Sequence, residues 1–418
     1  MQLRQALNRF NSIICPWMVW ILRIVVGATF IFSGFTKVVD PWGFVFKIQD
    51  YLNVWGIDFL WREVIFFFAI GLSLLEFCAG VMVLTGCLRH ASVQLLAVIM
   101  CFMLPLTAYI AVANPVSDCG CFGDAIVISN TASLVKNIVL SIAIAYLLFY
   151  NDRVQCLYPP LIQWMVIMAS VLYCLFLGFV GMNVQPMVDF RPYHIGQPLV
   201  EEASDDIQLV YKKGYITRYF STDSLPDSTW SYVGRVADNI SNRKHFAIFD
   251  DGEDVTEDVL SSDHPQLLLV VTSPEIHQKA RAGMANSLND YMKLHGGEML
   301  AIVALHPDSV AAWKSKAKAQ YDIYTADDTD LKELVRGDAA LVYLSDGKVK
   351  WKRSIYSLPA DFPDFDTYRN EMDFVKVPDD GKQFRKYTLI YFGALFAVYL
   401  LGQLRRIRAL RLVNEKKK

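Results

Sequence analysis

Residues 91–113 read ASVQLLAVIMCFMLPLTAYIAVA, and residues 114–124 continue as NPVSDCGCFGD. The first stretch carries no Asp, Glu, Lys or Arg. A helix of roughly 20 apolar residues crosses the about 30 Å of hydrocarbon in a bilayer. The first stretch therefore predicts a membrane-spanning helix, and the polar, glycine-containing stretch after it predicts a loop at the membrane surface.

Five further segments have a composition typical of spans: residues 17–38, 64–84, 132–150, 161–182 and the shorter 387–401. The chain has 418 residues, of which 54% are hydrophobic, more than a soluble protein usually carries. Its formal net charge of −2 argues against a nucleic acid partner, because such partners require a strongly basic face. We therefore expect an α-helical membrane protein with six spans, surrounded by membrane lipid.

Basic residues near the ends of the spans predict the orientation. They are Arg4, Arg9, Arg89, Arg153, Arg405, Arg406, Arg408, Arg411, Lys416, Lys417 and Lys418. If the six spans alternate, all of these residues lie on one side, which the positive-inside rule makes the cytoplasm. Both termini are then cytoplasmic, and the 114–124 loop and the long polar segment before the last span lie outside.

The polar segment is predicted to form an α/β domain. Its predicted strands cover residues 207–214, 246–252, 267–271, 299–305, 322–325, 340–344 and 349–352, and its predicted helices cover residues 274–291, 310–319 and 330–335. The order from residue 267 onward is typical of a thioredoxin-like fold. Redox-active members of that fold carry Cys-x-x-Cys at the start of the first helix, where this chain has Thr272-Ser273-Pro274-Glu275. We therefore expect this domain to bind or position a partner rather than to perform thiol chemistry.

Four segments follow from these patterns. Residues 1–157 are predicted to form a four-span bundle, and residues 158–184 a fifth span. Residues 185–385 form the α/β domain with its linker, and residues 386–418 form the sixth span and a basic tail. Within the first segment, Asp40 and Pro41 predict an N-cap and first helical residue, followed by a short helix that caps the bundle.

The predicted topology separates Cys119 and Cys121 from the other six cysteines. Only these two lie outside the cytoplasm and outside the spans, whereas the others are expected to be reduced or buried: Cys15, Cys78, Cys87, Cys101, Cys156 and Cys174. Gly120 and Gly123 allow a partner to approach closely. The neighbouring carboxylates Asp118 and Asp124 are expected to raise the pKa of the thiols.

Three kinds of chemistry fit a Cys-x-Cys pair in an oxidising compartment. The first is dithiol–disulfide exchange, since a very small disulfide ring is strained and readily reduced. The second is a static structural bridge. The third is a metal site formed by two thiolates and two carboxylates, but structural zinc sites prefer Cys and His, and no His is near. We therefore predict no metal.

Glu76 lies inside the span at residues 64–84, where a carboxylate is expensive and usually faces a partner or a cavity. Lys37 ends the first span. Because the first span runs outward and the second runs inward, Lys37 is near the outer surface and Glu76 lies past mid-depth, which leaves their direct pairing open. A packing role and a role in proton transfer both remain open for Glu76.

Several stretches carry a family resemblance: Leu22–Gly27, Ser33–Lys37, Asp40–Pro41, Glu76 and Asp118–Gly123. They resemble the DoxX/DoxD and MauE group of redox-associated membrane proteins. The Cys-Gly-Cys-Phe-Gly run is most similar to the MauE branch, which is tied to disulfide formation in a periplasmic methylamine-oxidising enzyme. The whole layout resembles DoxX-related proteins of Bacteroides-type bacteria. The resemblance implies a bundle similar to quinone-linked disulfide-generating proteins, hence a quinone cofactor, an inner-membrane location and a periplasmic α/β domain.

Two functional hypotheses follow. The first is an envelope thiol–disulfide redox or maturation factor, in which Cys119 and Cys121 exchange electrons with an envelope client protein. The second is a non-enzymatic scaffold or assembly factor whose thioredoxin-like domain binds an envelope partner. A transporter is a third reading, which rests only on Glu76.

Overall fold

The computed structural model describes residues 2–57, 61–116, 118–150, 152, 156–200, 207–213, 216–221, 231–237, 246–260, 264–273, 279–358 and 380–415. Predicted features at Arg153, residues 274–278 and residues 416–418 lie outside these ranges. The chain forms two compact units, Met1–Arg191 with Val377–Lys418, and Pro192–Lys376. We describe each unit by itself.

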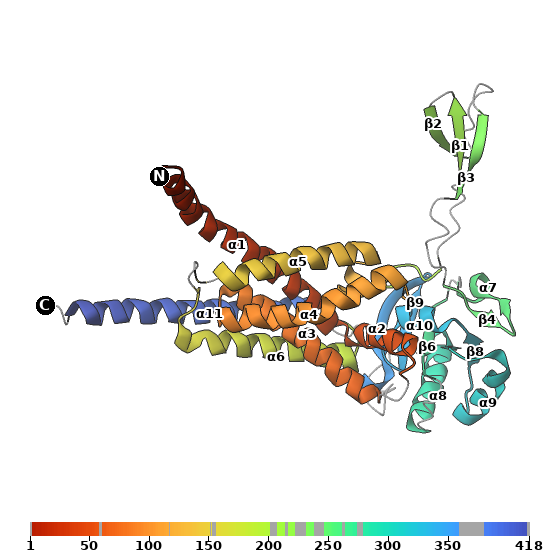
Figure 1. Ribbon diagram of the computed structural model, residues 1–418. Helices are drawn as coiled ribbons and strands as arrows, with labels where there is room; N and C mark the ends of the chain where they lie inside the picture. Colours follow the sequence, from red (N-terminus) through yellow and green to blue (C-terminus); the bar gives the residue numbers. More distant parts are fainter. Residues whose placement is uncertain are drawn as a thin grey trace. The chain divides into compact units, whose positions relative to one another are not determined.

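The first unit is helical (Figure 1). Its helices are α1 (Gln2–Val39), α2 (Pro41–Val54), α3 (Arg62–Thr85), α4 (Arg89–Ala113), α5 (Asn130–Tyr150), α6 (Gln163–Asn183) and α11 (Asp380–Glu415). Helices α3 and α4, α4 and α5, and α3 and α6 pack against each other, and their ribbons run side by side in Figure 1.

Six of these helices are long and apolar enough to cross a membrane, which confirms the six predicted spans. The apolar segments are Trp17–Val39, Arg62–Thr85, Arg89–Ala113, Asn130–Tyr150, Pro160–Asn183 and Gly381–Ile407. The last is longer than the predicted residues 387–401, because the helix continues past its apolar centre into charged turns at both ends. Large apolar side chains such as Phe67, Phe102 and Phe149 point outward, as expected of helices in contact with lipid.

Glycines allow α1 and α3 to pack backbone against backbone. A Cβ added at Gly34 would lie 2.8 Å from the Cα of Phe77, and a Cβ added at Gly80 would lie 2.6 Å from the amide nitrogen of Ile31. Small residues permit such close approach between helices in membranes. The two helices therefore have a fixed relative register, with the C-terminal part of α1 against the middle of α3.

Helix α2 occupies the part of α3 that α1 does not reach. Asp40 accepts a hydrogen bond from the Gly43 amide at 3.0 Å, and Pro41 is the first helical residue, so the predicted cap and short helix are confirmed. Trp42 packs edge-on against Phe66 of α3 with ring centroids 4.6 Å apart. Its indole also donates to the Met182 carbonyl at 3.0 Å, which ties α2 to the end of α6.

Helix α11 belongs to the same unit because its polar side chains pair with those of α6. The hydroxyls of Ser170 and Tyr391 lie 2.9 Å apart, as do those of Tyr173 and Thr388. The rings of Tyr173 and Tyr391 stack at 4.4 Å. These contacts place the last span directly against the fifth.

The second unit contains a seven-stranded mixed sheet in the order β10-β9-β6-β7-β8-β4-β5. The strands are β4 (Phe249–Asp250), β5 (Glu253–Asp254), β6 (Gln266–Val271), β7 (Glu298–Val303), β8 (Asp322–Thr325), β9 (Ala339–Ser345) and β10 (Lys348–Ser354), with helices α7 (Thr256–Leu260), α8 (Lys279–Leu294), α9 (Pro307–Ala317) and α10 (Asp328–Leu334). Strands β6, β7 and β8 are parallel, and β9 runs antiparallel to β6. All six residues of β6 are buried, as the continuous apolar run predicts.

The predicted hairpin near the end of this domain is present. Asp346 and Gly347 both have positive φ, 54° and 65°, as a tight turn between β9 and β10 requires. A separate antiparallel sheet in the order β2-β1-β3 was only partly predicted. It consists of β1 (Ile207–Lys213), β2 (Ile216–Ser221) and β3 (Ser231–Ala237), of which only β1 was expected. The other two strands are short and contain no continuous apolar run, so their composition resembles that of loops.

The close α1–α3 contact generates a stability prediction. Gly34→Ala should lower the free energy of unfolding by about 1–3 kcal/mol, because the new methyl group meets the backbone of Phe77. Thermal unfolding of the purified full chain in detergent measures the change. Gly71→Ala in α3 is the matched control, since no atom lies within 4 Å of its added Cβ. Equal melting temperatures for the two variants would contradict the tight register.

Candidate functional site

The loop between α4 and α5 is closed at its base by two asparagines. Asn114 ends α4 in a left-handed conformation, with φ of 47°. The side chain of Asn130, at the start of α5, donates to the Asn114 side chain at 2.7 Å and to the Val116 carbonyl at 2.9 Å. The two ends of the loop that carries both predicted site cysteines are therefore hydrogen-bonded to each other.

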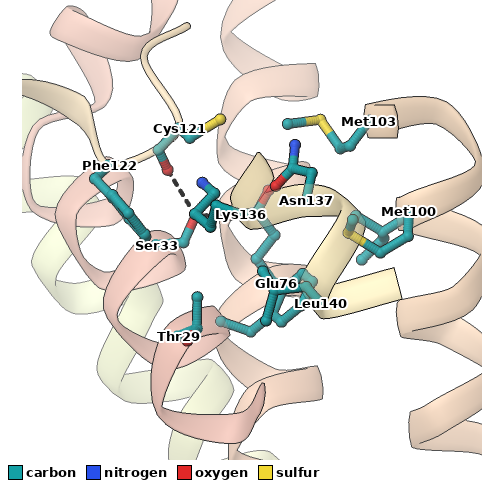
Figure 2. A pocket seen from close by; sticks show the side chains of 12 residues that line it. Thr29, Ser33, Glu76, Met100, Met103, Cys121, Phe122, Lys136, Asn137 and Leu140 are labelled. Atoms are coloured by element: carbon teal, nitrogen blue, oxygen red, sulfur yellow. Dashed lines mark hydrogen bonds between the residues drawn. The ribbon is translucent and has the colours of Figure 1, made fainter. Parts of the chain in front are cut away.

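The backbone on both sides of Gly120 is held against α1 and α2. The Tyr51 hydroxyl donates to the Cys119 carbonyl at 2.8 Å, and the Ser33 hydroxyl lies 2.7 Å from the Cys121 carbonyl oxygen, the contact drawn in Figure 2. Gly120 has a φ of 66°, and a Cβ there would lie 3.1 Å from the Cγ of Lys47. Glycine is needed at this position for both its conformation and its close approach to α2.

Both cysteines are buried free thiols, 7% and 5% exposed for Cys119 and Cys121. They share a hydrogen bond in which the Cys119 thiol donates to the Cys121 sulfur. This bond, together with the ammonium groups of Lys136 and Lys37, lowers the pKa of Cys121 to about 6 against the opposing effect of burial. The same bond and burial raise the pKa of Cys119 above its ordinary value. At neutral pH the pair therefore holds one thiolate, on Cys121.

The expected effect of the flanking aspartates is not what the structure shows. Asp118 forms an ion pair with Lys47 at 2.5 Å and accepts from the Gly120 amide at 2.9 Å, so its charge is compensated within the loop. Asp124 and Gly123 line a small cavity of about 10 Å³ together with Lys37 and Lys47. The positive charges near the thiols were missing from the expectation, and they favour the thiolate.

Lys37 and Glu76 form a buried ion pair, which answers a question that the sequence left open. The lysine nitrogen lies 2.9 Å and 2.8 Å from the two carboxylate oxygens, and each side chain is only 2% exposed. The sequence left the pairing open because Lys37 was expected near the outer surface and Glu76 past mid-depth. In the structure the end of α1 meets the middle of α3, and α2 covers the first turns of α3.

Ser33 links this ion pair to the cysteine loop. Its hydroxyl oxygen lies 2.8 Å from Glu76 Oε2 and 2.7 Å from the Cys121 carbonyl. A hydroxyl has one proton to donate, so the two acceptors share it. The position of the loop is thereby coupled to the buried carboxylate.

A cavity of about 20 Å³ lies beside Cys121 (Figure 2). Ser33, Glu76, Lys136 and Asn137 supply its polar lining, and methionine and leucine side chains supply its apolar lining. It is large enough for one water molecule. A quinone ring does not fit in either cavity next to the thiols, since small-molecule pockets are typically about 300–1,000 Å³.

Sequence reasoning missed three residues of the site: Lys47, Tyr51 and Lys136. Lys136 lies in α5, where its nitrogen sits 4.1 Å from the centre of the Phe122 ring. A single lysine in an otherwise apolar span is itself a signal for a functional position. Lys47 and Tyr51 are one helical turn apart on α2. They therefore lie on one polar face of that helix, and this face could have identified them from the sequence. Among the residues that the structure describes, no group of three or more Cys, His, Asp or Glu side chains is arranged to hold a metal.

The shared proton of the thiol pair predicts a pH profile. Alkylation of Cys121 by iodoacetamide should rise with pH, with a midpoint at about 6, because only the thiolate reacts. Cys119→Ala should move the midpoint to higher pH, since the donated hydrogen bond is lost. Mass spectrometry of the alkylated peptide measures both profiles. Cys78→Ala should leave the midpoint unchanged, and a Cys119→Ala profile identical to that of the natural sequence would exclude the shared proton.

The buried ion pair predicts an asymmetric pattern of stability. Glu76→Gln should destabilise the bundle by about 3–5 kcal/mol, because Lys37 is left as an unpaired buried charge. The double variant Lys37→Met, Glu76→Leu should recover most of that loss. Thermal unfolding of the full chain in detergent compares the two. A double variant less stable than Glu76→Gln would show that the pair itself stabilises the fold.

Comparison with known families agrees with this arrangement of the first four spans and their loop. Residues 15–150 match the family model described as methylamine utilisation protein MauE. No curated protein matches the chain. The matched residues contain the α1–α3 ion pair and the whole cysteine loop. The part of the chain that carries the candidate site is therefore a MauE-like membrane region.

Proposed function

We propose that this protein is a membrane-bound thiol–disulfide factor that acts on envelope proteins through Cys119 and Cys121. The observation that carries the proposal is the pairing of two buried free thiols, Cys119 and Cys121, with the ammonium groups of Lys37 and Lys136 close enough to lower the pKa of Cys121. A pair held in this way has one sulfur ready to attack and a second sulfur ready to resolve. The match of residues 15–150 to the methylamine utilisation protein MauE model supports the proposal, because the cysteine run resembles a branch tied to disulfide formation.

The exchange balances within the two proteins. The Cys121 thiolate attacks one sulfur of a client disulfide, the client S–S bond breaks, and the other client sulfur leaves as a thiolate. Cys119 loses its proton and attacks Cys121 in the mixed disulfide, which closes the Cys119–Cys121 bond and releases the client's second thiolate. One disulfide is consumed and one is formed. Run in reverse, the strained Cys-x-Cys disulfide is passed to a client, the direction that ring strain favours.

The loop anchors assign roles to the supporting residues. Tyr51 and Ser33 hold the two cysteine carbonyls, and Lys47 holds Asp118, so the sulfurs keep their relative position. Gly120 and Gly123 both have positive φ, and they give the loop the tight turns that place the two cysteines side by side. In Figure 2 the Cys121 sulfur points away from Ser33, so an attack at sulfur leaves the backbone anchor undisturbed.

The second unit supports a binding role in the same proposal. The order β10-β9-β6-β7, with β6 and β7 parallel and β9 antiparallel to β6, fits a thioredoxin-like core. After β6, the amides of Thr272 and Ser273 donate to the Asp338 carbonyl at 3.0 and 3.3 Å. Neither position is a cysteine, so we assign to this domain the capture of an envelope client. The positive residues of the short loops favour a plasma-membrane protein with this domain and the cysteine loop outside the cytoplasm.

Trapping of mixed disulfides tests the proposal. Cys119→Ser leaves the attacking Cys121 without its resolving partner, so it should accumulate disulfide-linked envelope proteins in membranes. Cys121→Ser should trap much less, because Cys119 has the higher pKa. Non-reducing electrophoresis followed by mass spectrometry identifies the adducts, and Cys174→Ser is the control that should trap nothing. If neither loop variant forms an adduct, thiol exchange at this site is wrong.

The scaffold alternative and the thiol–disulfide proposal predict opposite results for a variant that lacks both loop cysteines. A non-enzymatic assembly factor would retain full function in a Cys119→Ser, Cys121→Ser double variant, measured as the yield of mature client enzyme. The thiol–disulfide proposal requires that yield to fall to the level of a strain without the protein.

A further inference from the structure

The structure brings a second pair of cysteines together at the end of the bundle opposite the Cys119 loop. Cys87 lies between α3 and α4, and Cys156 lies in the segment between α5 and α6. The sequence predicted two unrelated reduced thiols at these positions. In the structure the Leu157 amide donates to the Thr85 carbonyl at 3.0 Å, the Cys156 sulfur lies 3.7 Å from the same carbonyl oxygen, and the Cys87 and Cys156 side chains interact with each other.

Gly86 and Gln163 shape this second pair. Gly86 has a φ of 78°, and a Cβ there would lie 3.2 Å from the Cys156 Cα, so only glycine allows the two segments to meet. The buried side chain of Gln163 donates to the Cys156 sulfur at 3.3 Å and to the Tyr158 carbonyl at 3.1 Å. Its oxygen accepts from the Leu88 amide at 2.9 Å. One glutamine therefore clamps both cysteine segments.

A buried guanidinium lies beside the pair. Arg23 of α1 is 1% exposed, and its Nε donates to the Val83 carbonyl at 2.9 Å. Its two terminal nitrogens have no hydrogen-bond partner among the residues that the structure describes. A buried cation is costly without a nearby anion. The hydrogen bond from Cys87, with the charges of Arg23 and Arg89, lowers the pKa of Cys156 to about 6 and so supplies that anion.

Cys156 also lines an open pocket of about 840 Å³ formed by the ends of α4, α6 and α11. Its charged lining is basic and consists of Arg89, His90, Arg405 and Arg406. Asp152 pairs with Arg89 at 2.9 Å and lies 3.2 Å from His90, which leaves the lining with net positive charge. The volume is that of a small-molecule site. Cys156 is half-buried at its wall, whereas Cys87 is fully buried behind it.

We propose that Cys87 and Cys156 form a second redox-active dithiol, which exchanges with a negatively charged low-molecular-weight disulfide bound in this pocket. The Cys156 thiolate attacks one sulfur of the ligand disulfide, and the other half of the ligand leaves as a thiolate. Cys87 loses its proton and attacks Cys156, which forms the Cys87–Cys156 bond and releases the second half of the ligand. The ligand disulfide is reduced to two thiols, and the protein dithiol is oxidised. Arg23 is a positioning residue that holds the thiolate charge.

Mass spectrometry of the full chain in detergent tests this pair separately from the first. The background is Cys119→Ser, Cys121→Ser, and the probe is glutathione disulfide. Incubation should produce a Cys87–Cys156 linked peptide, and an added Cys87→Ser should instead leave a glutathione adduct on Cys156. An added Cys156→Ser should leave Cys87 unmodified, while Cys78 and Cys174 stay free throughout as internal controls. No linked peptide together with no adduct in the Cys87→Ser variant would overturn the proposal.

A charge comparison tests the role of the pocket. Arg405→Gln, Arg406→Gln should slow modification of Cys156 by glutathione disulfide about tenfold, because electrostatic attraction raises the local concentration of an anionic ligand. Modification by the neutral hydroxyethyl disulfide should be unchanged in the same variant. A variant that reacts with both reagents at the rate of the parent would show that the basic pocket does not select the ligand. These results do not depend on the function proposed for Cys119 and Cys121.

Discussion

The buried ion pair between Lys37 and Glu76 determines how the rest of the membrane unit is assembled. Two charges that are both almost completely buried in an apolar bundle must face each other, since neither can be left alone at that depth. This requirement sets the register of α1 against α3, and the glycines Gly34 and Gly80 make that register sterically possible. Helix α2 then fills the remaining surface of α3. The cysteine loop packs on the surface formed by α1 and α2, because these helices supply its hydrogen-bond and ion-pair partners Ser33, Lys47 and Tyr51.

The surface formed by α1 and α2 explains how a short, glycine-containing loop is held in one position. The carbonyls of Cys119 and Cys121 each accept a hydrogen bond from a helix side chain, and the Gly120 amide donates to Asp118 within the loop. The carboxylate of Asp118, which would oppose a thiolate if it were alone, is bonded to Lys47 and to the Gly120 amide. Asp118 therefore has a structural role in the loop. The positive charges near the sulfurs come from Lys37 of α1 and Lys136 of α5. Charge near a thiol depends on where long side chains end, and neighbours in sequence are a poor guide to it.

The fold was predictable where one local rule dominates. Apolar runs located the spans, Asp40 and Pro41 located the start of α2, and the Asp346-Gly347 turn located the last hairpin. Strands β2 and β3 were missed because short strands of mixed polarity differ little from loops in composition. The pairing of Lys37 with Glu76 stayed open because it depends on the register between two helices, which hydropathy does not contain. For the same reason Cys87 and Cys156, from two different connections, could not be paired from the sequence.

Arg23 and Ser33 lie on the same helix, and at about 1.5 Å of rise per residue their levels are about 15 Å apart. Arg23 lies beside the Cys87–Cys156 pair at one end of the bundle, and Ser33 holds the loop with Cys119 and Cys121 at the opposite end. Disulfide exchange requires sulfurs in bonding contact at about 2 Å, so a disulfide cannot pass directly from one pair to the other through the bundle. The Cys119–Cys121 pair and the Cys87–Cys156 pair are therefore separate sites, and oxidation of one pair does not require oxidation of the other. Helix α1 contacts both cysteine pairs, and it holds them too far apart to exchange a disulfide directly.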